Sequence, residues 1–317
     1  MSRATAPASI LYHCEGDDGR MLEALRAALP ARGIRRWPEP GDPRAITDAI
    51  VWLPPPDFFD GLVSLERVHA LAAGIDQLLA HPGLPARATL IRLEDAGMGE
   101  RMAEYVLHGV LHAHRRFPEL AAARRARRWA HELQADEAAE FGVGVLGAGA
   151  LGRVVMRRLV ANGYPVGCWS RTPRTLPEGV AGHVGARGLD DCLAAARALV
   201  CLLPLTDATR GILDRALFER LPRGAFLINP GRGGHLVEED LLAALDAGHL
   251  CGAQLDVFAE EPLPPEHPFW DDPRLLLTPH VAAPSPVAGS VAQVASSFAA
   301  IARGERPAGT VDRARGY

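Results

Sequence analysis

Short apolar runs alternate with amphipathic stretches over about the first third of the chain. Ser9–Cys14, Ala49–Leu53 and Ala88–Arg92 are apolar runs of strand length, and three prolines follow the second of them. Arg20–Leu29 carries leucines at steps of three and four residues, which predicts a helix. Leu71–Asp76 contains a glycine and predicts a tight turn. Strands that alternate with helices predict a mostly parallel sheet with helices on its faces.

The rest of the chain repeats this pattern with clearer signals. A helical periodicity extends from Gly99 to His131. Val143–Leu146 is a continuous apolar run, typical of a strand buried on both faces, and a helix over Leu151–Asn162 and a strand over Pro165–Trp169 follow. Further predicted elements are the strands Leu199–Leu203, Ala225–Asn229, Ala253–Val257 and Leu275–Thr278 and the helix Glu238–Leu245. This order predicts a doubly wound α/β domain.

Length and composition are those of an ordinary globular protein. The 317 residues suggest about two domains of roughly 150 residues each. A hydrophobic content of 48% and a charged content of 23% argue against disorder. The net charge of -4 gives no electrostatic reason to expect nucleic acid or an anionic membrane as a partner. Every basic residue is an arginine, which excludes mechanisms that need a lysine amine.

The cysteines and the amino-terminal residues bear on the cellular compartment. The chain has 5 cysteines without a C-x-x-C pair, which indicates neither a disulfide framework nor a zinc site. No apolar run approaches the roughly 18 residues of a membrane-spanning helix. Met1–Glu15 lacks the long apolar region of a secretory signal. We therefore expect a cytoplasmic protein.

A glycine-rich motif lies between a predicted strand and a predicted helix. From Gly147 to Gly152 the sequence reads G-A-G-A-L-G, and this is the context that the dinucleotide fingerprint G-x-G-x-x-G requires. Gly147 permits a tight turn, Gly149 lets the backbone approach a pyrophosphate, and Gly152 lets the helix pack closely on the strand. With Ala150 and Leu151, these residues would offer the N–H groups of a helix N-terminus to phosphates.

The residues after the next predicted strand indicate which dinucleotide binds. NAD-binding proteins place an Asp or Glu about 20 residues beyond the glycines, where it accepts hydrogen bonds from the ribose. Here Trp169–Arg174 reads W-S-R-T-P-R and contains no carboxylate. Arg171, assisted by Ser170, Thr172 and Arg174, is suited to pair with a 2′-phosphate. The sequence predicts NADP(H) as the preferred cofactor and NAD(H) as the second; alternatively, these arginines are ordinary surface residues.

Three further segments follow predicted strands, at the carboxyl ends where open α/β sheets place ligands. The glycines of Asn229–Gly233 leave Arg232 on an open turn, where a guanidinium is suited to a bidentate contact with a carboxylate. Asp256–Pro264 carries acidic residues into a proline-rich loop, and Thr278–His280 places a histidine just past a strand. Each segment alone is ambiguous, because a single histidine after a strand is more often structural than catalytic.

Together these segments resemble the D-2-hydroxyacid dehydrogenases over nearly the whole chain, and more narrowly the bacterial glyoxylate/hydroxypyruvate reductases. The stretches that carry this resemblance are Arg92–Gly99, Cys168–Thr172, Glu238–Leu245 and Val311–Tyr317. The resemblance implies an α/β protein of two Rossmann-like domains. A doubly wound parallel-sheet NAD(P)-binding domain would cover 96–283. A smaller flavodoxin-like substrate domain would cover 1–95 and be completed by 284–317. A homodimer is also implied, with the helix after Gly99 as a contact.

The resemblance assigns catalytic roles to three residues. His280 would be the general acid that protonates the keto oxygen as hydride arrives from the nicotinamide. Glu261 would hydrogen-bond the other ring nitrogen and favour the imidazolium form. Arg232 would bind the substrate carboxylate and polarise the carbonyl. Of two adjacent acids, Glu261 is chosen over Glu260 because the family places its glutamate directly before Pro-Leu.

The same resemblance implies further binding residues. The Ala73–Gly74 turn would offer backbone N–H groups to the substrate carboxylate, beside Arg232 and His280. Additional cofactor contacts would come from Leu203, Pro204, Pro230, Arg232, Asp256 and His280. Pro230 departs from the family pattern, which often has a small residue there. Trp52 and Met98 are either pocket walls or core residues.

Two other clusters of residues could form functional sites. His108 and His112 have the spacing of two zinc ligands on one helical face, with His114 nearby, but no glutamate follows His108. We therefore predict no metal site. The basic run Arg124–Trp129 predicts a solvated helix face or, alternatively, a contact between domains or subunits.

The function expected from these features is the NADPH-dependent reduction of small 2-keto acids, glyoxylate to glycolate or hydroxypyruvate to D-glycerate, with His280 as general acid. A second interpretation keeps the chemistry and assigns a larger aryl or branched 2-keto acid. A third is a non-catalytic NAD(P)-sensing module, against which the presence of Arg232, Glu261 and His280 argues.

Overall fold

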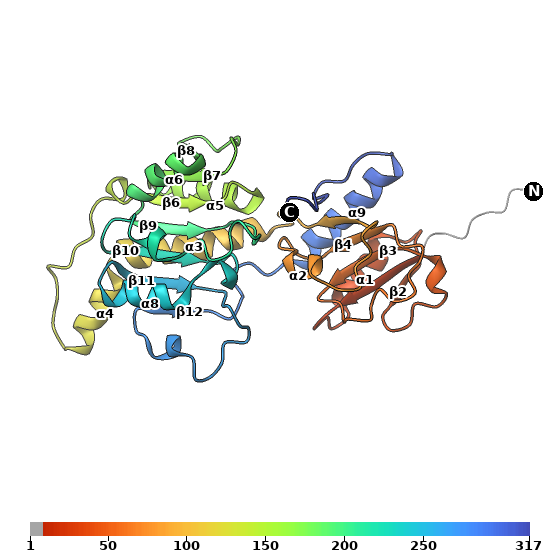
Figure 1. The fold of residues 1–317 in the computed structure, drawn as a ribbon, viewed down its shortest axis with the longest axis horizontal. Coiled ribbons are helices and arrows are strands. Elements are labelled where there is room, and N and C mark those ends of the chain that lie inside the picture. The colour runs from red at the N-terminus through yellow and green to blue at the C-terminus, as the bar shows by residue number, and fades with distance from the viewer. Residues whose placement is uncertain (1–8) are drawn as a thin grey trace, which may run out of the picture. The chain divides into compact units, whose positions relative to one another are not determined.

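The computed structural model describes residues 9–317 and divides into two compact units, each built on one parallel sheet (Figure 1). The chain up to Gly97 forms the first unit together with Ser285–Tyr317, and Met98–Pro284 forms the second. Residues 1–8, which belong to the expected substrate domain and to the Met1–Glu15 segment, lie outside the described residues.

The first unit contains a 5-stranded sheet in the order β2-β1-β3-β4-β5, with every neighbouring pair parallel. Its strands are β1 (Ser9–Cys14), β2 (Ile34–Arg36), β3 (Ile46–Trp52), β4 (Arg67–Ala70) and β5 (Thr89–Arg92). Its helices are α1 (Arg20–Ala28), α2 (Asp76–Leu79) and α9 (Val287–Ala302). This strand order is that of flavodoxin, which confirms the predicted fold of this unit.

Alternate residues of the central strands bury both faces of this sheet. Ile10 and Ile50 belong to a core cluster with residues of α1 and α9, whereas Leu11 and Val51 belong to the cluster on the other face. The carboxyl-terminal segment contributes to both clusters, since α9 supplies Phe298 to the first and the residues beyond α9 supply Val311 to the second.

A buried ionic group ties β3 to β4. The Asp48 side chain is 0% exposed and accepts hydrogen bonds from Arg67 Nε at 2.5 Å and Thr47 Oγ1 at 2.7 Å. Arg32 and His69 lie near the same carboxylate, at 3.8 and 3.9 Å. Burial alone would raise the pKa of Asp48, but the contacts with His69 and Arg67 outweigh it and hold the pKa well below its usual range.

The second unit contains a 7-stranded parallel sheet in the order β12-β11-β10-β9-β6-β7-β8. Its strands are β6 (Val143–Leu146), β7 (Val166–Ser170), β8 (Val180–Val184), β9 (Ala198–Cys201), β10 (Ala225–Asn229), β11 (Leu250–Leu255) and β12 (Leu275–Leu277). Its helices are α3 (Met98–His114), α4 (Phe117–Arg125), α5 (Ala150–Ala161), α6 (Gly185–Ala194), α7 (Arg215–Phe218) and α8 (Glu238–Asp246). Counted from β6, this is the Rossmann order, and the chain reverses direction across the sheet between β6 and β9, where such folds bind dinucleotides.

Both faces of the second sheet are buried, as the continuous apolar strands predict. Val145 and Val200 belong to the core cluster that includes residues of α3 and α5, whereas Leu146 and Leu199 belong to the opposite cluster with residues of α6, α7 and α8. Helix α3 packs along α5 on one face. The doubly wound prediction is therefore confirmed.

The helical stretch expected from Gly99 to His131 consists of two helices and ends at Arg125. Helix α3 ends at His114, and Arg116 then takes a left-handed conformation with φ 58° before α4 begins. Pro118 occupies the first turn of α4, where it cannot continue the preceding helix's hydrogen bonds. The helix ladder is thus interrupted between α3 and α4.

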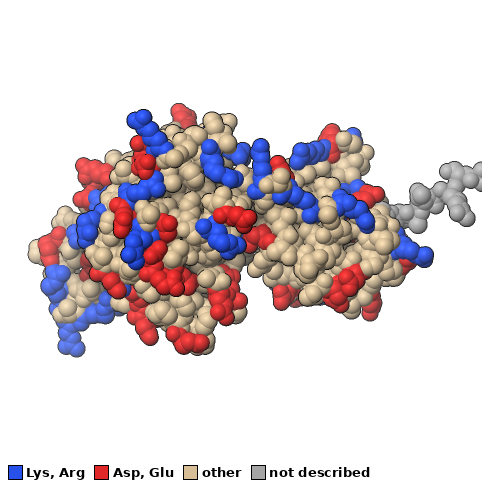
Figure 2. All heavy atoms as spheres, in the orientation of Figure 1, with Lys and Arg blue, Asp and Glu red and all other residues tan. Residues whose placement is uncertain are grey.

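The basic run expected on a helix face lies at and beyond the end of α4. Arg124, Arg125, Arg127 and Arg128 are exposed, and Trp129 is 90% exposed. Basic side chains gather over α4 in Figure 2, while both signs of charge are interspersed over the rest of the face shown. Among residues 9–317, no helix has the length and apolar character needed to cross a membrane.

Candidate active site

Two glycines of the fingerprint are required by the packing of the protein itself. Gly147 has φ 114°, and a Cβ there would lie 2.7 Å from the carbonyl oxygen of Leu202. At Gly152 a Cβ would lie 2.4 Å from the carbonyl oxygen of Gly147. The start of α5 therefore lies directly against the turn after β6, and this turn lies beside the Leu202–Leu203 peptide that follows β9.

The middle glycine has a different environment. Gly149 has an ordinary φ of -71°, and a Cβ there would meet nothing within 4 Å. Gly149 is also the N-cap of α5, whose first turn has neither a capping side chain nor an acidic residue. The space beside Gly149 is therefore open, and the first N–H groups of α5, among them those of Ala150 and Leu151, have no capping side chain and would suit a phosphate group. The motif as the structure has it suits a dinucleotide pyrophosphate.

The residues predicted to select the dinucleotide follow β7 directly. Ser170 is the last residue of this strand, and its hydroxyl donates to the carbonyl oxygen of Thr172 at 2.8 Å. Arg171, Thr172 and Arg174 are exposed. Gly147 N donates to Trp169 O at 3.0 Å, so the end of β7 adjoins the glycine turn.

A histidine–carboxylate pair forms at the carboxyl ends of β11 and β12. His280 Nδ1 lies 2.8 Å from Glu261 Oε2, and Glu261 Oε1 accepts a hydrogen bond from Phe258 N at 3.0 Å. The other ring nitrogen, Nε2, therefore points away from the carboxylate. Partial burial would raise the pKa of Glu261, but these two hydrogen bonds outweigh it. The positive charge of Arg232 acts in the same direction, so the pKa of Glu261 lies below its usual value.

Asp256 fastens the segment that carries His280. This carboxylate is 1% exposed and accepts hydrogen bonds from Thr278 Oγ1 at 2.7 Å, Val281 N at 2.8 Å and Ala282 N at 2.9 Å. His280 N in turn donates to the carbonyl oxygen of Asp256 at 2.8 Å. Asp256 thus fixes the backbone on both sides of His280. His280 itself has a left-handed backbone conformation, with φ 55°. The resemblance assigned Asp256 to the cofactor, and a cofactor contact stays a prediction.

Arg232 lies on a turn shaped by a buried asparagine. Asn229 is 0% exposed; its Oδ1 accepts from Gly231 N at 3.2 Å and its Nδ2 donates to Arg232 O at 3.1 Å. Pro230, between them, is buried. A Cβ at Gly233 would lie 1.8 Å from the carbonyl oxygen of Phe258. The Arg232 turn is therefore packed directly on the segment that holds Glu261.

A polar network behind His280 was not foreseen from the sequence. The Tyr105 hydroxyl lies 2.8 Å from Thr278 Oγ1, and burial raises the pKa of Tyr105 to about 12. Gln254, which is 1% exposed, donates from Nε2 to Tyr105 O at 2.9 Å and lies 2.8 Å from His108 Nδ1. A glutamine inside the otherwise apolar strand β11 was the available signal.

The remaining predicted residues fall in several places. Ala73 and Gly74 lie in the first unit, after β4, and Arg92 Nη1 donates to Ala73 O at 3.3 Å. Trp52 ends β3, and Met98 is a buried residue at the start of α3. Leu203 and Pro204 follow β9 beside Gly147.

The clustered histidines of α3 have protein partners. His108 contacts Gln254, as described above, and His114 contacts Tyr164 Oη at 3.0 Å and Asp136 O at 2.7 Å. In the described part of the chain, no three side chains of His, Cys, Asp or Glu come together in a way that could hold a metal ion.

A Rossmann domain that brings a dinucleotide fingerprint, a histidine–glutamate pair and an arginine to the carboxyl ends of its strands defines a nicotinamide-dependent oxidoreductase. The family model described as "D-isomer specific 2-hydroxyacid dehydrogenase, NAD binding domain" matches residues 107–282, within the second unit. The chain belongs to the D-isomer specific 2-hydroxyacid dehydrogenase family, whose members are NAD(P)-dependent oxidoreductases acting on CH–OH groups. The expected family is thereby confirmed.

Solved structures agree with this membership. A D-isomer specific 2-hydroxyacid dehydrogenase from Xanthobacter autotrophicus Py2, in complex with NADPH and MES, is 38% identical, with 98% of this chain and 100% of that chain covered and a TM-score of 0.92. The NADPH-dependent glyoxylate/hydroxypyruvate reductase of Sinorhizobium meliloti, in complex with NADP and sulfate, has the same identity and coverage and a TM-score of 0.90. A probable 2-hydroxyacid dehydrogenase from Rhizobium etli CFN 42, in complex with NADP, HEPES and L(+)-tartaric acid, is 35% identical over 98% of this chain and 99% of that chain, with a TM-score of 0.88.

Proposed function

We propose that the protein reduces small 2-keto acids with NADPH, converting glyoxylate to glycolate and hydroxypyruvate to D-glycerate. The observation that carries the proposal is the 2.8 Å contact between His280 and Glu261 in a Rossmann domain, with the Arg232 turn packed on the same segment. The 38% identity to a reductase named for these two substrates and for NADPH supports the choice of substrate and cofactor.

In this proposal His280 holds and delivers the proton. Glu261 stays ionised because its pKa is lowered, and its contact with Nδ1 fixes the orientation of the imidazole ring. Nε2 then carries the proton that passes to the keto oxygen, so that the oxygen becomes the hydroxyl of the product. The reduced nicotinamide, when bound, supplies the hydride for the carbonyl carbon.

Binding and orientation fall to other residues. Arg232 presents a guanidinium that can grip the substrate carboxylate with two parallel hydrogen bonds. Ala73 and Gly74 are proposed to offer backbone N–H groups to the same carboxylate. The cofactor would be held by the motif from Gly147 to Gly152, whose open middle glycine suits the pyrophosphate, and by Leu203, Pro204 and Pro230.

The experiment that tests this function follows the absorbance loss of NADPH, and separately of NADH, with glyoxylate and with hydroxypyruvate. We expect rapid oxidation that favours NADPH. His280→Ala should abolish turnover and leave the Kd for NADPH within about threefold, because the side chain moves protons and adds little binding. Turnover retained by His280→Ala would remove this residue from the mechanism. If only larger 2-keto acids were reduced, one of them would take the place of glyoxylate and hydroxypyruvate as the proposed substrate. Cofactor binding without any turnover would favour a sensing module.

The cofactor preference is proposed to come from Arg171. Without a carboxylate in the Ser170–Arg174 segment, a 2′-phosphate meets no repulsion and a guanidinium can pair with it. Arg171→Ala should raise the Kd for NADPH by about tenfold, the equivalent of about 1.4 kcal/mol, and leave the Kd for NADH unchanged. Fluorescence titration with both cofactors measures this. Equal effects on the two would contradict a 2′-phosphate role.

We also propose a homodimer that uses α3 and the residues after it, in the cytoplasm. Leu111, Phe117 and Trp129 are large apolar side chains exposed on this stretch, at 38%, 49% and 90%. All five cysteines are free thiols, which suits a reducing compartment. Light scattering coupled to gel filtration tests the dimer, and a monomer at micromolar concentration would contradict it.

A further inference from the structure

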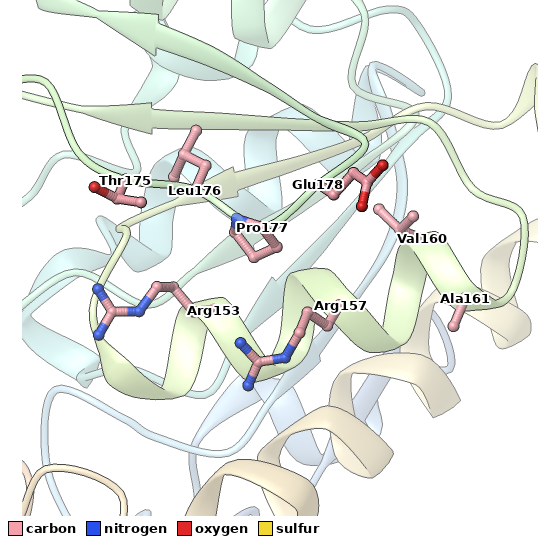
Figure 3. Close-up of a pocket in the computed structure, with 8 residues that line it drawn as sticks. All are labelled: Arg153, Arg157, Val160, Ala161, Thr175, Leu176, Pro177 and Glu178. Atoms are coloured by element: carbon pink, nitrogen blue, oxygen red, sulfur yellow. The ribbon is translucent and has the colours of Figure 1, made fainter.

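A pocket in the second unit opens between α5 and the loop that continues from the Ser170–Arg174 segment (Figure 3). Its volume is about 560 Å³, within the range of small-ligand sites. Its lining residues are Arg153, Arg157, Val160 and Ala161 from α5 and Thr175, Leu176, Pro177 and Glu178 from the loop. The loop wall thus begins with the residue after Arg174.

The charges in this pocket are unbalanced. Arg153 and Arg157 are exposed, and no ion pair or side-chain hydrogen bond within residues 9–317 includes either guanidinium. They are one helical turn apart, where like charges repel each other. Arg153 also lies in the first turn of α5, next to the positive end of the helix dipole, and this turn has no acidic residue. Both positions disfavour the isolated helix and favour an anion bound beside it.

Another arginine of the same helix shows the contrast. Arg158 follows Arg157 directly, lies in the last turn of α5 and forms an ion pair with Glu100. The acidic residue of the pocket, Glu178, is drawn in Figure 3 at the end away from both guanidinium groups, and no ion pair joins it to them. The arginine end of the pocket is therefore cationic.

We propose that Arg153 and Arg157 bind the 2′-phosphate of NADP(H) from the α5 side, while the Ser170–Arg174 segment binds it from the loop side. The proposal rests on the proposed function, because it assumes that the cofactor is NADP(H). A phosphate dianion has the charge and the acceptor oxygens that two guanidinium groups recognise. Arg153 lies one turn after Gly149, on the helix whose N-terminus is proposed to bind the pyrophosphate. Residues of one helix, α5, would then bind both the pyrophosphate and the 2′-phosphate of the same dinucleotide.

The test measures Kd values for NADPH, NADH, 2′,5′-ADP and 5′-AMP by titration calorimetry. Arg153→Ala should raise the Kd for NADPH and for 2′,5′-ADP by about tenfold, or about 1.4 kcal/mol, with NADH and 5′-AMP unchanged. Arg157→Ala should act in the same sense, and Arg153→Lys should restore part of the affinity because it keeps the charge. Arg158→Ala is the matched control, since this arginine already has a carboxylate partner, and it should leave all four Kd values unchanged.

Several results would overturn the proposal. Arg153→Ala and Arg157→Ala variants that keep the wild-type ratio of NADPH to NADH affinity would exclude these residues from the cofactor site. If the two variants lost affinity for 5′-AMP as strongly as for 2′,5′-ADP, the pocket would bind a phosphate other than the 2′-phosphate. A wild-type protein that binds NADPH and NADH equally would instead contradict the proposed cofactor itself. The Kd values of the wild-type protein for NADPH and NADH therefore show whether the proposed cofactor or the proposed role of the pocket has failed.

Discussion

The Asp256→Asn substitution tests whether the hydrogen bonds around His280 position it for proton transfer. The carboxylate accepts three hydrogen bonds, two on Oδ1 from Thr278 and Val281 and one on Oδ2 from Ala282. An asparagine has one acceptor oxygen and a donating NH₂ group. If its oxygen keeps the contacts of Oδ1, its NH₂ faces the N–H of Ala282, so that two donors meet and one bond is lost.

The cost follows from this geometry. The lost bond leaves a buried donor unsatisfied, which costs about 1–3 kcal/mol, and the two remaining bonds lose their charge assistance, at about 0.5–1 kcal/mol each. We expect the free energy of unfolding to fall by about 2–5 kcal/mol on these grounds. Displacement of His280 by even about 1 Å is expected to lower kcat by about a hundredfold.

Two measurements check this prediction, urea unfolding of the apo protein and kcat with a saturating 2-keto acid and NADPH. Asp214→Asn is the matched control, because Asp214 caps α7 through a single bond to Leu217 N and asparagine caps helices equally well. Asp256→Asn with wild-type stability and wild-type kcat would refute the reasoning. Lost stability with intact kcat would show that the carboxylate supports the fold without positioning His280.

The remaining predictions concern the glycine motif and the buried ionic group. Gly149→Ala should leave the melting temperature near that of the wild type but raise the Kd for NADPH at least about tenfold, because its Cβ occupies only the open space where the pyrophosphate is expected. Gly152→Ala should lower the free energy of unfolding by about 1–3 kcal/mol, because its Cβ overlaps the carbonyl oxygen of Gly147. Unchanged NADPH binding in Gly149→Ala would contradict the first expectation, and unchanged stability in Gly152→Ala would contradict the second. Since Asp48 has a lowered folded-state pKa, its stabilisation is present above the unfolded pKa of about 4 and is lost as pH falls through the folded value. Asp48→Asn should cost about 3–5 kcal/mol at pH 7 and flatten the loss of stability below about pH 4, and equal pH slopes in urea unfolding would argue against this assignment.

Local signals in the sequence were sufficient for the elements that bind phosphate in this fold. Val143–Leu146 is a strand with the predicted bounds, and the glycines after it make the predicted turn. A continuous apolar run and a glycine that must take a positive φ are properties of a few neighbouring residues. The parallel direction of the strands followed from the alternation of strands and helices, because parallel strands need crossover connections.

Features that depend on distant residues were not predicted. Strand β4 (Arg67–Ala70) contains an arginine and a histidine, and its Arg67 pairs with the buried carboxylate of Asp48 on β3. The hydrogen bonds between Asp256 and the segment around His280 connect residues more than twenty positions apart in the sequence. The sequence placed Asp256 and Thr278 next to strands but contained no information on which donor faces which acceptor.

The return of the carboxyl-terminal segment to the first unit affects the order in which the protein can fold during synthesis. Phe298 and Val311 complete the two core clusters of that unit, although its strands begin at Ser9. Domains generally fold as they leave the ribosome, amino-terminal first. Here the second unit, Met98–Pro284, is entirely synthesised before the residues that close the first core emerge. The part of the protein that is translated first is therefore the last that can become fully folded, and a premature stop after Pro284 would leave β1–β5 without α9 while the Rossmann unit stayed complete.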